Sequence, residues 1–280
     1  MNFIKIKSFA KVNLALNIIS KSRKLHNIES LVTFINLHDL ILIKEIKSKK
    51  NLISFTGKFS KNINSNNTVS KLFKILDKKK LISKKFHIRI IKNIPQKAGL
   101  GGGSINAARI LSYLIKKKII RVNKKQISEI TAYIGTDVIL GLKLYNSVLT
   151  SKNKIQTFRN CKKLYTLITK PTFGCSTNYI YSKVKKFDKA KFNKPSRKMF
   201  SFNFLKKMSN SLEKIAFNRF STLKKIKAYL NNLHNPIFVR MTGSGSALVS
   251  YYYSKKQCDA AQKQFNKDYK KYWCISSKTI

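Results

Sequence analysis

The sequence has no long apolar run and no clear targeting segment. No stretch of it approaches the ~18 uninterrupted apolar residues of a membrane-spanning helix. The apolar segment at residues 12–19 is interrupted by Asn13 and Asn17, and no convincing cleavage site follows it. A start without acidic residues before Glu29 is also compatible with a transit peptide, but the motifs described below begin near Ser8. We therefore expect a cytoplasmic protein.

Cysteine is scarce, and its spacing argues against a metal site or a disulfide framework. None of the cysteines forms a C-x-x-C pair or lies beside histidines in a metal-ligand pattern. We expect reduced thiols at the four positions, which are Cys161, Cys175, Cys258 and Cys274.

Acidic residues are few, and the chain is strongly basic. Only 10 Asp and Glu stand against 59 Lys and Arg, so the formal net charge is +49. Such an excess is typical of proteins that neutralise nucleic-acid phosphates. Here the lysines are spread from end to end among many Asn and Ile residues, as an A+T-biased coding sequence would produce, and no arginine-rich or aromatic-interleaved module stands out. We expect no specific nucleic-acid partner, although the positive potential could speed capture of an anionic substrate.

The pattern that is present is that of a globular α+β protein. Hydrophobic residues make up 43% of the chain, which is ample for a buried core. Alternating apolar residues predict strands, and apolar residues at helical spacing predict helices. Strands are expected near residues 3–6, 12–16, 32–46 with a turn at Asp39, 86–90, 164–169 and within 238–253. Helices are expected over residues 68–80, 105–118, 124–133 and twice between 212 and 233. Because the pattern starts afresh beyond residue 156, we predict two α+β domains, 1–158 and 159–280.

A glycine-rich segment between a predicted strand and a predicted helix is the strongest local signal. Residues 95–108 read P-Q-K-A-G-L-G-G-G-S-I-N-A-A. Glycines let a backbone approach a ligand closely, and the following helix offers unpaired N–H groups and the positive end of its dipole to phosphate. A glycine hinge or tight turn is the alternative. We expect a phosphate-binding loop made by Pro95, Gln96, Lys97, Ala98, Gly99, Leu100, Gly101, Gly102, Gly103, Ser104 and Ile105.

The loop is not one of the commonest nucleotide motifs. No Gly-Lys-Ser/Thr follows, so it is not a P-loop, and Ser104 stands where a dinucleotide fingerprint needs its last small glycine. No H-R-D or D-F-G motif occurs either, which argues against a protein kinase.

Three ordered motifs resemble those of the GHMP kinases. The loop at residues 95–108 is similar to their P-x-x-x-G-L-G-G-G-S-x-N-A-A segment, residues 8–14 resemble their N-terminal A-K-[IVL]-N-L strand, and residues 241–247 resemble their M-[ST]-G-[ST]-G turn. The resemblance implies a two-domain fold, with an N-terminal α+β ATP-binding domain and a C-terminal ferredoxin-like α+β domain. It also implies an ATP-dependent small-molecule kinase that uses Mg²⁺.

Further residues resemble one subgroup of these kinases. Residues 134–138, I-G-T-D-V, are similar to its [IL]-G-A-D-V-P segment, and residues 25–31 stand where it has G-Y-H-x-L-x-[ST]. This subgroup phosphorylates the 2-hydroxyl of a diphosphocytidyl-bearing alcohol in the non-mevalonate isoprenoid pathway. The resemblance therefore implies that this alcohol is the substrate.

The resemblance assigns roles to individual residues. Asp137 would be the catalytic base, and Lys11 would lie beside it and polarise the acceptor hydroxyl. An aspartate that follows a helix-ending glycine is otherwise an ordinary turn or capping residue. The substrate-binding residues would be Asn13, His26, Thr177 and Tyr181, with His26 and Tyr181 at the cytosine. Ser104 could reach a phosphate or the metal, whose ligands stay unassigned, and Asn66, Asn67 and Lys97 are adenine-site candidates by position only.

The chain also departs from the subgroup pattern. Leu25 replaces a tyrosine that stacks on cytosine, Lys24 replaces a glycine, and Ile139 stands in place of a proline. A G-x-G-E element is absent from residues 151–154. These changes do not touch the glycine loop, Lys11 or Asp137, so they bear on the expected substrate rather than on the expected reaction type. The alternatives are a GHMP kinase for homoserine or mevalonate, or a non-catalytic binder of nucleotide or nucleic acid. A monomer and a homodimer are both open.

Overall fold

The computed structural model describes residues 2–22 and 26–280 of the chain. Its backbone forms two compact units. Unit 1 consists of Met1–Ala10, Leu37–Pro95 and Gly101–Leu144, and unit 2 of Lys11–Asn36, Gln96–Leu100 and Tyr145–Ile280. The chain thus passes repeatedly from one unit to the other. It enters unit 2 for the last time after Leu144, before the predicted boundary near residue 158. The division into domains 1–158 and 159–280 stays a prediction.

Two long strands contribute to both units. They are β1 (Ile4–Lys21) and β2 (His26–Ile46), which pair with each other. The predicted turn at Asp39 is wrong, because Asp39 lies within β2 and is fully buried. Its carboxylate is surrounded by hydrogen-bond donors, so a residue that usually marks a turn is stabilised in the middle of a strand.

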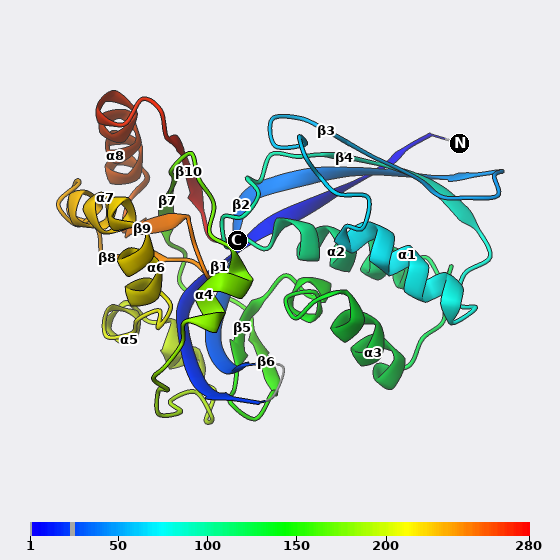
Figure 1. The fold of residues 1–280 in the computed structure, drawn as a ribbon, viewed down its shortest axis with the longest axis horizontal. Helices are drawn as coiled ribbons and strands as arrows, with labels where there is room; N and C mark the ends of the chain where they lie inside the picture. The colour runs from blue at the N-terminus through cyan, green and yellow to red at the C-terminus, as the bar shows by residue number, and fades with distance from the viewer. Residues whose placement is uncertain (1, 23–25) are drawn as a thin grey trace. The chain divides into compact units, whose positions relative to one another are not determined.

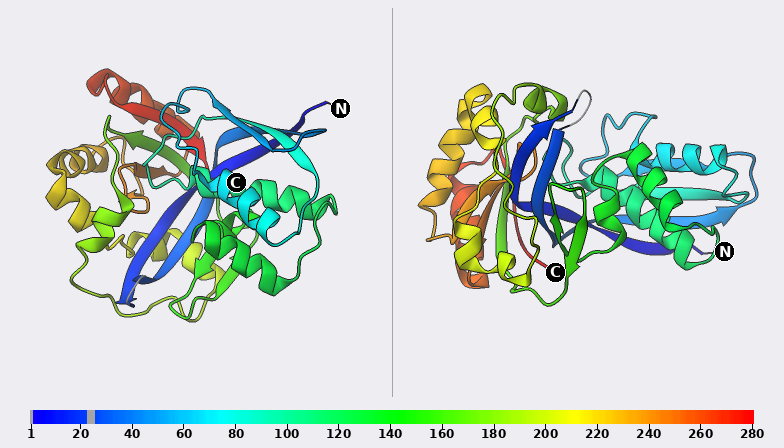
Figure 2. Two further views of the ribbon diagram at one scale, coloured as in Figure 1. Left: turned by 45° about the vertical axis from the view of Figure 1, so that its right-hand side comes forward. Right: turned by 90° about the horizontal axis from the view of Figure 1, so that it is seen from below.

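Unit 1 is a sheet with helices on one face. Strands β3 (Leu52–Thr56) and β4 (Lys85–Ile91) join the C-terminal part of β2 in the order β3-β4-β2, with β3 parallel and β2 antiparallel to β4. The helices are α1 (Thr68–Lys78), α2 (Gly102–Lys116) and α3 (Lys124–Ile134), followed by the 3-10 helix η1 (Ile139–Leu142). All three α-helices lie on the same side of these strands (Figures 1 and 2). One apolar core joins them to β2 and β4.

Local sequence explains where these helices begin. Asn67 caps α1, because its side chain accepts hydrogen bonds from the backbone N–H groups of Val69 and Ser70 at 3.0 and 3.1 Å. Asn123 and Gln126 form a capping box at the start of α3. The helices predicted over residues 68–80, 105–118 and 124–133 are confirmed, with α2 beginning three residues earlier than expected.

Unit 2 contains a four-stranded antiparallel sheet in the order β10-β7-β9-β8. Its strands are β7 (Tyr165–Lys170), β8 (Phe238–Met241), β9 (Leu248–Tyr252) and β10 (Trp273–Lys278). Helical segments separate β7 from β8, and α8 (Lys255–Asp268) separates β9 from β10. The resulting β-α-β-β-α-β order confirms the predicted ferredoxin-like arrangement.

The other elements of unit 2 complete the fold. Strands β5 (Asn146–Leu149) and β6 (Ile155–Phe158) extend the sheet of β2, through residues 30–32 paired with 147–149. The remaining helices are α4 (Thr177–Ser182), η2 (Arg197–Phe200), α5 (Phe202–Lys206), α6 (Glu213–Arg219) and α7 (Ser221–Asn231). The core of unit 2 includes residues of α6, α7 and α8 packed with those of β7, β8 and β9.

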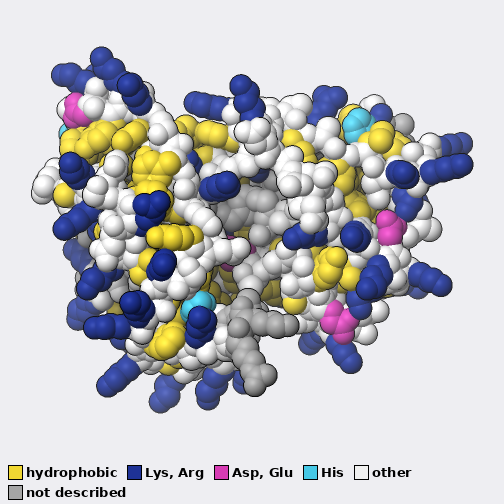
Figure 3. All heavy atoms as spheres, in the orientation of Figure 1, with side chains coloured by type: hydrophobic (Ala, Val, Ile, Leu, Met, Phe, Trp, Pro, Cys, Tyr) yellow, Lys and Arg dark blue, Asp and Glu magenta, His cyan; other side chains and the backbone are white. Residues whose placement is uncertain are grey.

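Lys and Arg side chains are scattered over the visible face without forming a single patch, and few acidic side chains lie among them (Figure 3). Within residues 2–22 and 26–280, no helix is long and apolar enough to cross a membrane. The four cysteines are free thiols, as predicted. Burial raises the pKa of Cys175 to about 11 and those of Cys258 and Cys274 to about 12, so these thiols stay protonated.

Candidate active site

The glycine loop connects the end of β4 to the start of α2. Its backbone enters the left-handed region at Lys97, Gly99 and Gly101, with φ of 51°, 73° and 69°. Gly101 directly precedes α2 and, as a glycine, provides no side-chain cap to that helix. The first N–H groups of α2 can donate hydrogen bonds to an anion such as phosphate, and the positive end of the helix dipole attracts the same negative charge.

The middle of the loop, residues 96–100, is held by the glycine turn at residues 242–247. The backbone N–H of Ala247 donates to the carbonyl of Ala98 at 3.2 Å, and the hydroxyl of Thr242 donates to the carbonyl of Gly99 at 3.1 Å. Gly99 must be glycine, since a Cβ there would lie 2.0 Å from the carbonyl oxygen of Thr242. The C-terminal turn therefore fixes the conformation of the loop.

The N-terminal motif joins the same network in unit 2. The backbone N–H of Lys11 donates to the carbonyl of Leu100 at 3.0 Å, and its ammonium donates to the side-chain oxygen of Asn13 at 2.7 Å. Asn13 in turn donates from its backbone to the Thr242 hydroxyl at 3.0 Å and from its amide to Ser30 at 2.9 Å. Lys11 and Asn13 are each only 4% exposed. The three sequence motifs thus meet through one set of buried hydrogen bonds.

In unit 1, Ser104 lies close to the turn that carries Asp137. Ser104 is in the first turn of α2, and a Cβ built on Gly135 would lie 3.7 Å from its hydroxyl oxygen. Asp137 follows Gly135 in a turn closed by the N–H of Val138, which donates to the carbonyl of Gly135 at 3.1 Å. The half-buried Asp137 therefore stands on a hydrogen-bonded turn next to the start of α2. Lys11 and Asp137 belong to different units, and their proximity stays a prediction.

Two of the predicted substrate residues contact each other in unit 2. The rings of His26 and Tyr181 lie 5.2 Å apart between centroids, at an angle of 47°. Burial, together with the charge of Lys21, lowers the pKa of His26 below its ordinary value of 6.5. The imidazole is therefore neutral at physiological pH. Its buried Nε2 has no hydrogen-bond partner among the described residues, so it has the capacity to bind a polar ligand atom.

The fourth substrate candidate contacts the glycine turn instead. The hydroxyls of Thr177 and Ser244 lie 2.9 Å apart, within hydrogen-bonding distance. Leu25 and Lys24, the two departures from the subgroup pattern beside His26, lie outside the described residues. Asn67, an adenine-site candidate, serves as the cap of α1.

Sequence reasoning assigned no role to several residues of this network. Thr242 and Ser244 lie within the motif at residues 241–247, but the spacing of that motif does not indicate which atoms they bind. Asn210 carried no signal at all. Its amide donates to the carbonyls of Met241 and Gly243, both at 2.8 Å, and so holds the glycine turn in place.

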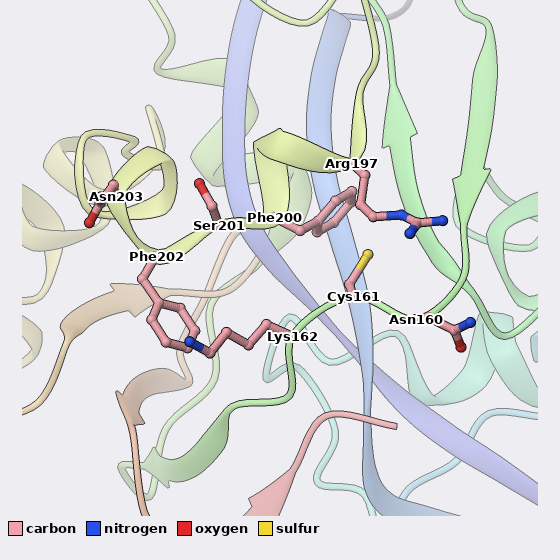
Figure 4. A pocket seen from close by; sticks show the side chains of 8 residues that line it. All are labelled: Asn160, Cys161, Lys162, Arg197, Phe200, Ser201, Phe202 and Asn203. Atoms are coloured by element: carbon pink, nitrogen blue, oxygen red, sulfur yellow. The ribbon is translucent and has the colours of Figure 1, made fainter.

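A separate pocket of about 430 Å³ lies in unit 2 (Figure 4). None of the predicted site residues lines it. Its lining residues are Asn160, Cys161, Lys162, Arg197, Phe200, Ser201, Phe202 and Asn203. In a chain this basic, two cations beside a groove do not by themselves indicate a ligand.

Comparisons with known proteins agree with the fold and with the motifs. A family model described as the GHMP kinases N terminal domain matches residues 67–143, which include the glycine loop and Asp137. A solved homoserine kinase from Cytophaga hutchinsonii aligns with a TM-score of 0.72 at 14% identity, over 100% of this chain and 95% of its own. These matches show that the chain contains a GHMP kinases N terminal domain and has the fold of a small-molecule kinase of this type.

The sequence comparison is more specific. The 4-diphosphocytidyl-2-C-methyl-D-erythritol kinase of Pelagibacter ubique is 54% identical over 100% of both chains. A solved 4-(cytidine 5'-diphospho)-2C-methyl-D-erythritol kinase aligns with a TM-score of 0.79 at 21% identity, over 98% of this chain and 99% of its own. The chain belongs to the family of the 4-diphosphocytidyl-2-C-methyl-D-erythritol kinases. It is therefore an ATP-using small-molecule kinase.

Proposed function

We propose that this chain transfers the γ-phosphoryl group of ATP to the 2-hydroxyl of 4-diphosphocytidyl-2-C-methyl-D-erythritol, in the non-mevalonate route to isoprenoid precursors. The observation that carries the proposal is the 54% identity, over the full length of both chains, to a relative named for this activity. The similarity in fold to homoserine and mevalonate kinases does not favour those substrates, since it holds at identities of 15% or less.

The glycine loop would hold the ATP phosphates. Phosphoryl transfer requires mainly positioning and charge neutralisation, which backbone N–H groups and a helix N-terminus supply. The support is the left-handed backbone at Gly99 and Gly101 and the network that fixes residues 96–100. A loop fixed before ATP binds loses little conformational entropy when the phosphates arrive.

Asp137 would accept the proton of the 2-hydroxyl as that oxygen attacks the γ-phosphorus. The ADP oxygen leaves as the new O–P bond forms. Lys11 would supply positive charge to stabilise the charge that develops during transfer. Its ammonium is oriented by Asn13, and its burial strengthens its electrostatic effect.

Mg²⁺ suits this site only in combination with the nucleotide. Among the described residues, no group of three or more His, Cys, Asp or Glu side chains could hold a metal ion. Mg²⁺ characteristically binds through one or two protein oxygens together with substrate phosphates. The Ser104 hydroxyl would hold it together with the ATP phosphates, whose charge the ion would neutralise.

His26 and Tyr181 would bind the cytosine, and Thr177 and Asn13 the rest of the alcohol substrate. The neutral imidazole of His26 can hydrogen-bond a base edge, and the ring of Tyr181 offers a face for stacking. We also infer a cytoplasmic enzyme, active as a monomer or homodimer, without a specific nucleic-acid partner.

A turnover assay tests the proposal. Purified protein with Mg-ATP is offered the diphosphocytidyl alcohol, homoserine and mevalonate in parallel, and ADP release and the phosphorylated product are measured. We expect product only from the diphosphocytidyl alcohol. Phosphorylation of another alcohol, with the diphosphocytidyl compound left unchanged, would overturn the substrate assignment but not the kinase class.

A further inference from the structure

The carboxylate of Asp39 lies in the middle of β2, is fully buried, and is surrounded by donors from the segment after β4 and from α2, both in unit 1. Its Oδ1 accepts the backbone N–H groups of Asn93 and Ile94, both at 2.8 Å. Its Oδ2 accepts the amide of Asn106 at 3.0 Å and the ammonium of Lys92. A carboxylate can accept about four hydrogen bonds, so these donors satisfy the hydrogen-bonding capacity of Asp39.

These donors flank the glycine loop in the sequence. Lys92, Asn93 and Ile94 directly precede Pro95, where the loop begins, and Asn106 lies on α2, where the loop has ended. One carboxylate therefore binds the chain on both sides of a loop whose own backbone is rich in glycine. Because glycine has little intrinsic conformational preference, the shape of such a loop depends on what fixes its ends.

Asp39 also compensates the positive charge of a buried lysine. Lys92 is 4% exposed, and its ammonium lies 3.3 Å from the position that a Cβ on Gly102 would occupy. A buried cation there stands beside the positive end of the α2 dipole, which is unfavourable unless a negative group compensates it. Asp39 is that group. The ion pair with Asp39 thus keeps the charged Lys92 next to the N-terminus of α2.

We propose that Asp39 is a positioning residue for ATP: it sets the spacing between the end of β4 and the start of α2, and so preorganises the loop for the phosphates. The inference rests on the proposed function in that it needs nucleotide phosphates at this loop. It differs from a purely stabilising role, because a loosened loop binds ATP more weakly while the binding of the alcohol substrate is unaffected.

Three variants test this proposal. Asn106→Ala removes only the link from α2, leaves the buried ion pair intact, and should fold. Asp39→Asn keeps the shape but removes the charge. Asp77→Asn is the matched control, because Asp77 is another carboxylate of unit 1, exposed and paired with Lys85 at 2.8 Å. Each variant is measured for binding of a non-hydrolysable ATP analogue by calorimetry, for the KM of ATP and of the alcohol, and for melting temperature.

We expect Asn106→Ala to weaken ATP-analogue binding and raise the KM for ATP by about tenfold, which is the size of effect expected when one hydrogen bond to a charged group is lost. The KM for the alcohol should change by less than about twofold, and Asp39→Asn should show the larger ATP effect where it folds. Asp77→Asn should match the parent protein. An Asn106→Ala protein that melts at a lower temperature but binds ATP like the parent would overturn the inference.

Failure of the proposed function is recognised separately. If the parent protein phosphorylates a different alcohol, the substrate assignment fails, while the calorimetric comparison of the variants still judges Asp39. If the parent protein binds no ATP analogue, both conclusions fail together.

Discussion

The hydroxyl of Thr242 donates to the carbonyl oxygen of Gly99 at 3.1 Å, across 143 residues of sequence. The same hydroxyl accepts the backbone N–H of Asn13 at 3.0 Å. One small side chain thereby joins the C-terminal glycine turn, the phosphate loop and the N-terminal strand. It is also fully buried, so neither partner can replace it with water.

Thr242→Val should therefore weaken both stability and catalysis. The change keeps the shape and leaves the carbonyl of Gly99 and the N–H of Asn13 without this partner, at a cost of about 1–3 kcal/mol in the free energy of unfolding. Urea unfolding and kcat/KM for ATP measure the two effects. Thr131→Val is the control, since the Thr131 hydroxyl donates to carbonyls of its own helix and has no other hydrogen bond among the described residues. Equal losses of kcat/KM in both variants would contradict a special role for Thr242.

Gly99→Ala should disturb the phosphate loop directly. The added Cβ would meet the carbonyl oxygen of Thr242 at 2.0 Å, and φ of +73° is unfavourable for alanine. The loop must then shift, so we expect ATP-analogue affinity to fall at least tenfold, or about 1.4 kcal/mol. Gly135→Ala is the comparison for melting temperature, because its Cβ would make only an ordinary 3.7 Å contact with the Ser104 hydroxyl. Unchanged ATP affinity in Gly99→Ala would show that the loop tolerates the shift.

Asp137→Asn should abolish phosphoryl transfer while leaving nucleotide binding largely intact. A positioned general base contributes about 10²- to 10⁴-fold to the rate, and an amide cannot accept the proton. The measurements are kcat and calorimetric binding of an ATP analogue. Asp259→Asn, which removes an exposed carboxylate paired with Lys255 on α8, is the control. Full turnover in Asp137→Asn would remove this residue from the mechanism.

The affinity for the cytidine-bearing substrate should depend on pH through His26. Its pKa lies below 6.5, first because of burial and second because of Lys21, so the neutral imidazole prevails above that pH. The KM for the alcohol should be flat from about pH 7 upward and rise as pH falls below 6.5. The imidazole of His26 binds a proton less readily in the folded state than in the unfolded state. Its contribution to the free energy of unfolding is therefore present above pH 6.5 and is lost as the pH falls below that value.

Titration by NMR checks the cause of this shift. Lys21→Gln removes one of the two causes, so the pKa of His26 should move up toward 6.5. Lys5→Gln, a neutralisation elsewhere on the chain, should leave it where it is. A His26 pKa at or above 6.5 in the parent protein would refute the neutral-imidazole interpretation.

The net charge of +49 should produce only non-specific binding to nucleic acid. Fluorescence anisotropy with two unrelated DNA duplexes should give equal, weak affinities that fall steeply with salt, because counterion release is the driving force. Nanomolar, sequence-selective binding at physiological salt would instead identify a nucleic-acid partner.

Local patterns predicted much of the fold because they reflect local physics. The spacing of Val69, Leu72, Phe73 and Leu76 placed α1, since these side chains must share one buried face. The alternation in residues 86–90 placed β4 for the same reason. Asp39 was misplaced because its stabilising partners are 53 or more residues away in the sequence, where no local pattern can reveal them.

By itself, the sequence predicted the class of chemistry: a glycine loop before a helix indicates phosphate binding, and the ordered motifs make the aspartate behind another helix a candidate base. Only the tertiary structure decided what holds that loop. Thr242, Asn13 and Asn210 fix its middle from unit 2, and Asp39 binds the residues on both sides of it in unit 1. Buried polar groups must find hydrogen-bond partners, and those partners are chosen by the folded backbone rather than by proximity in the chain.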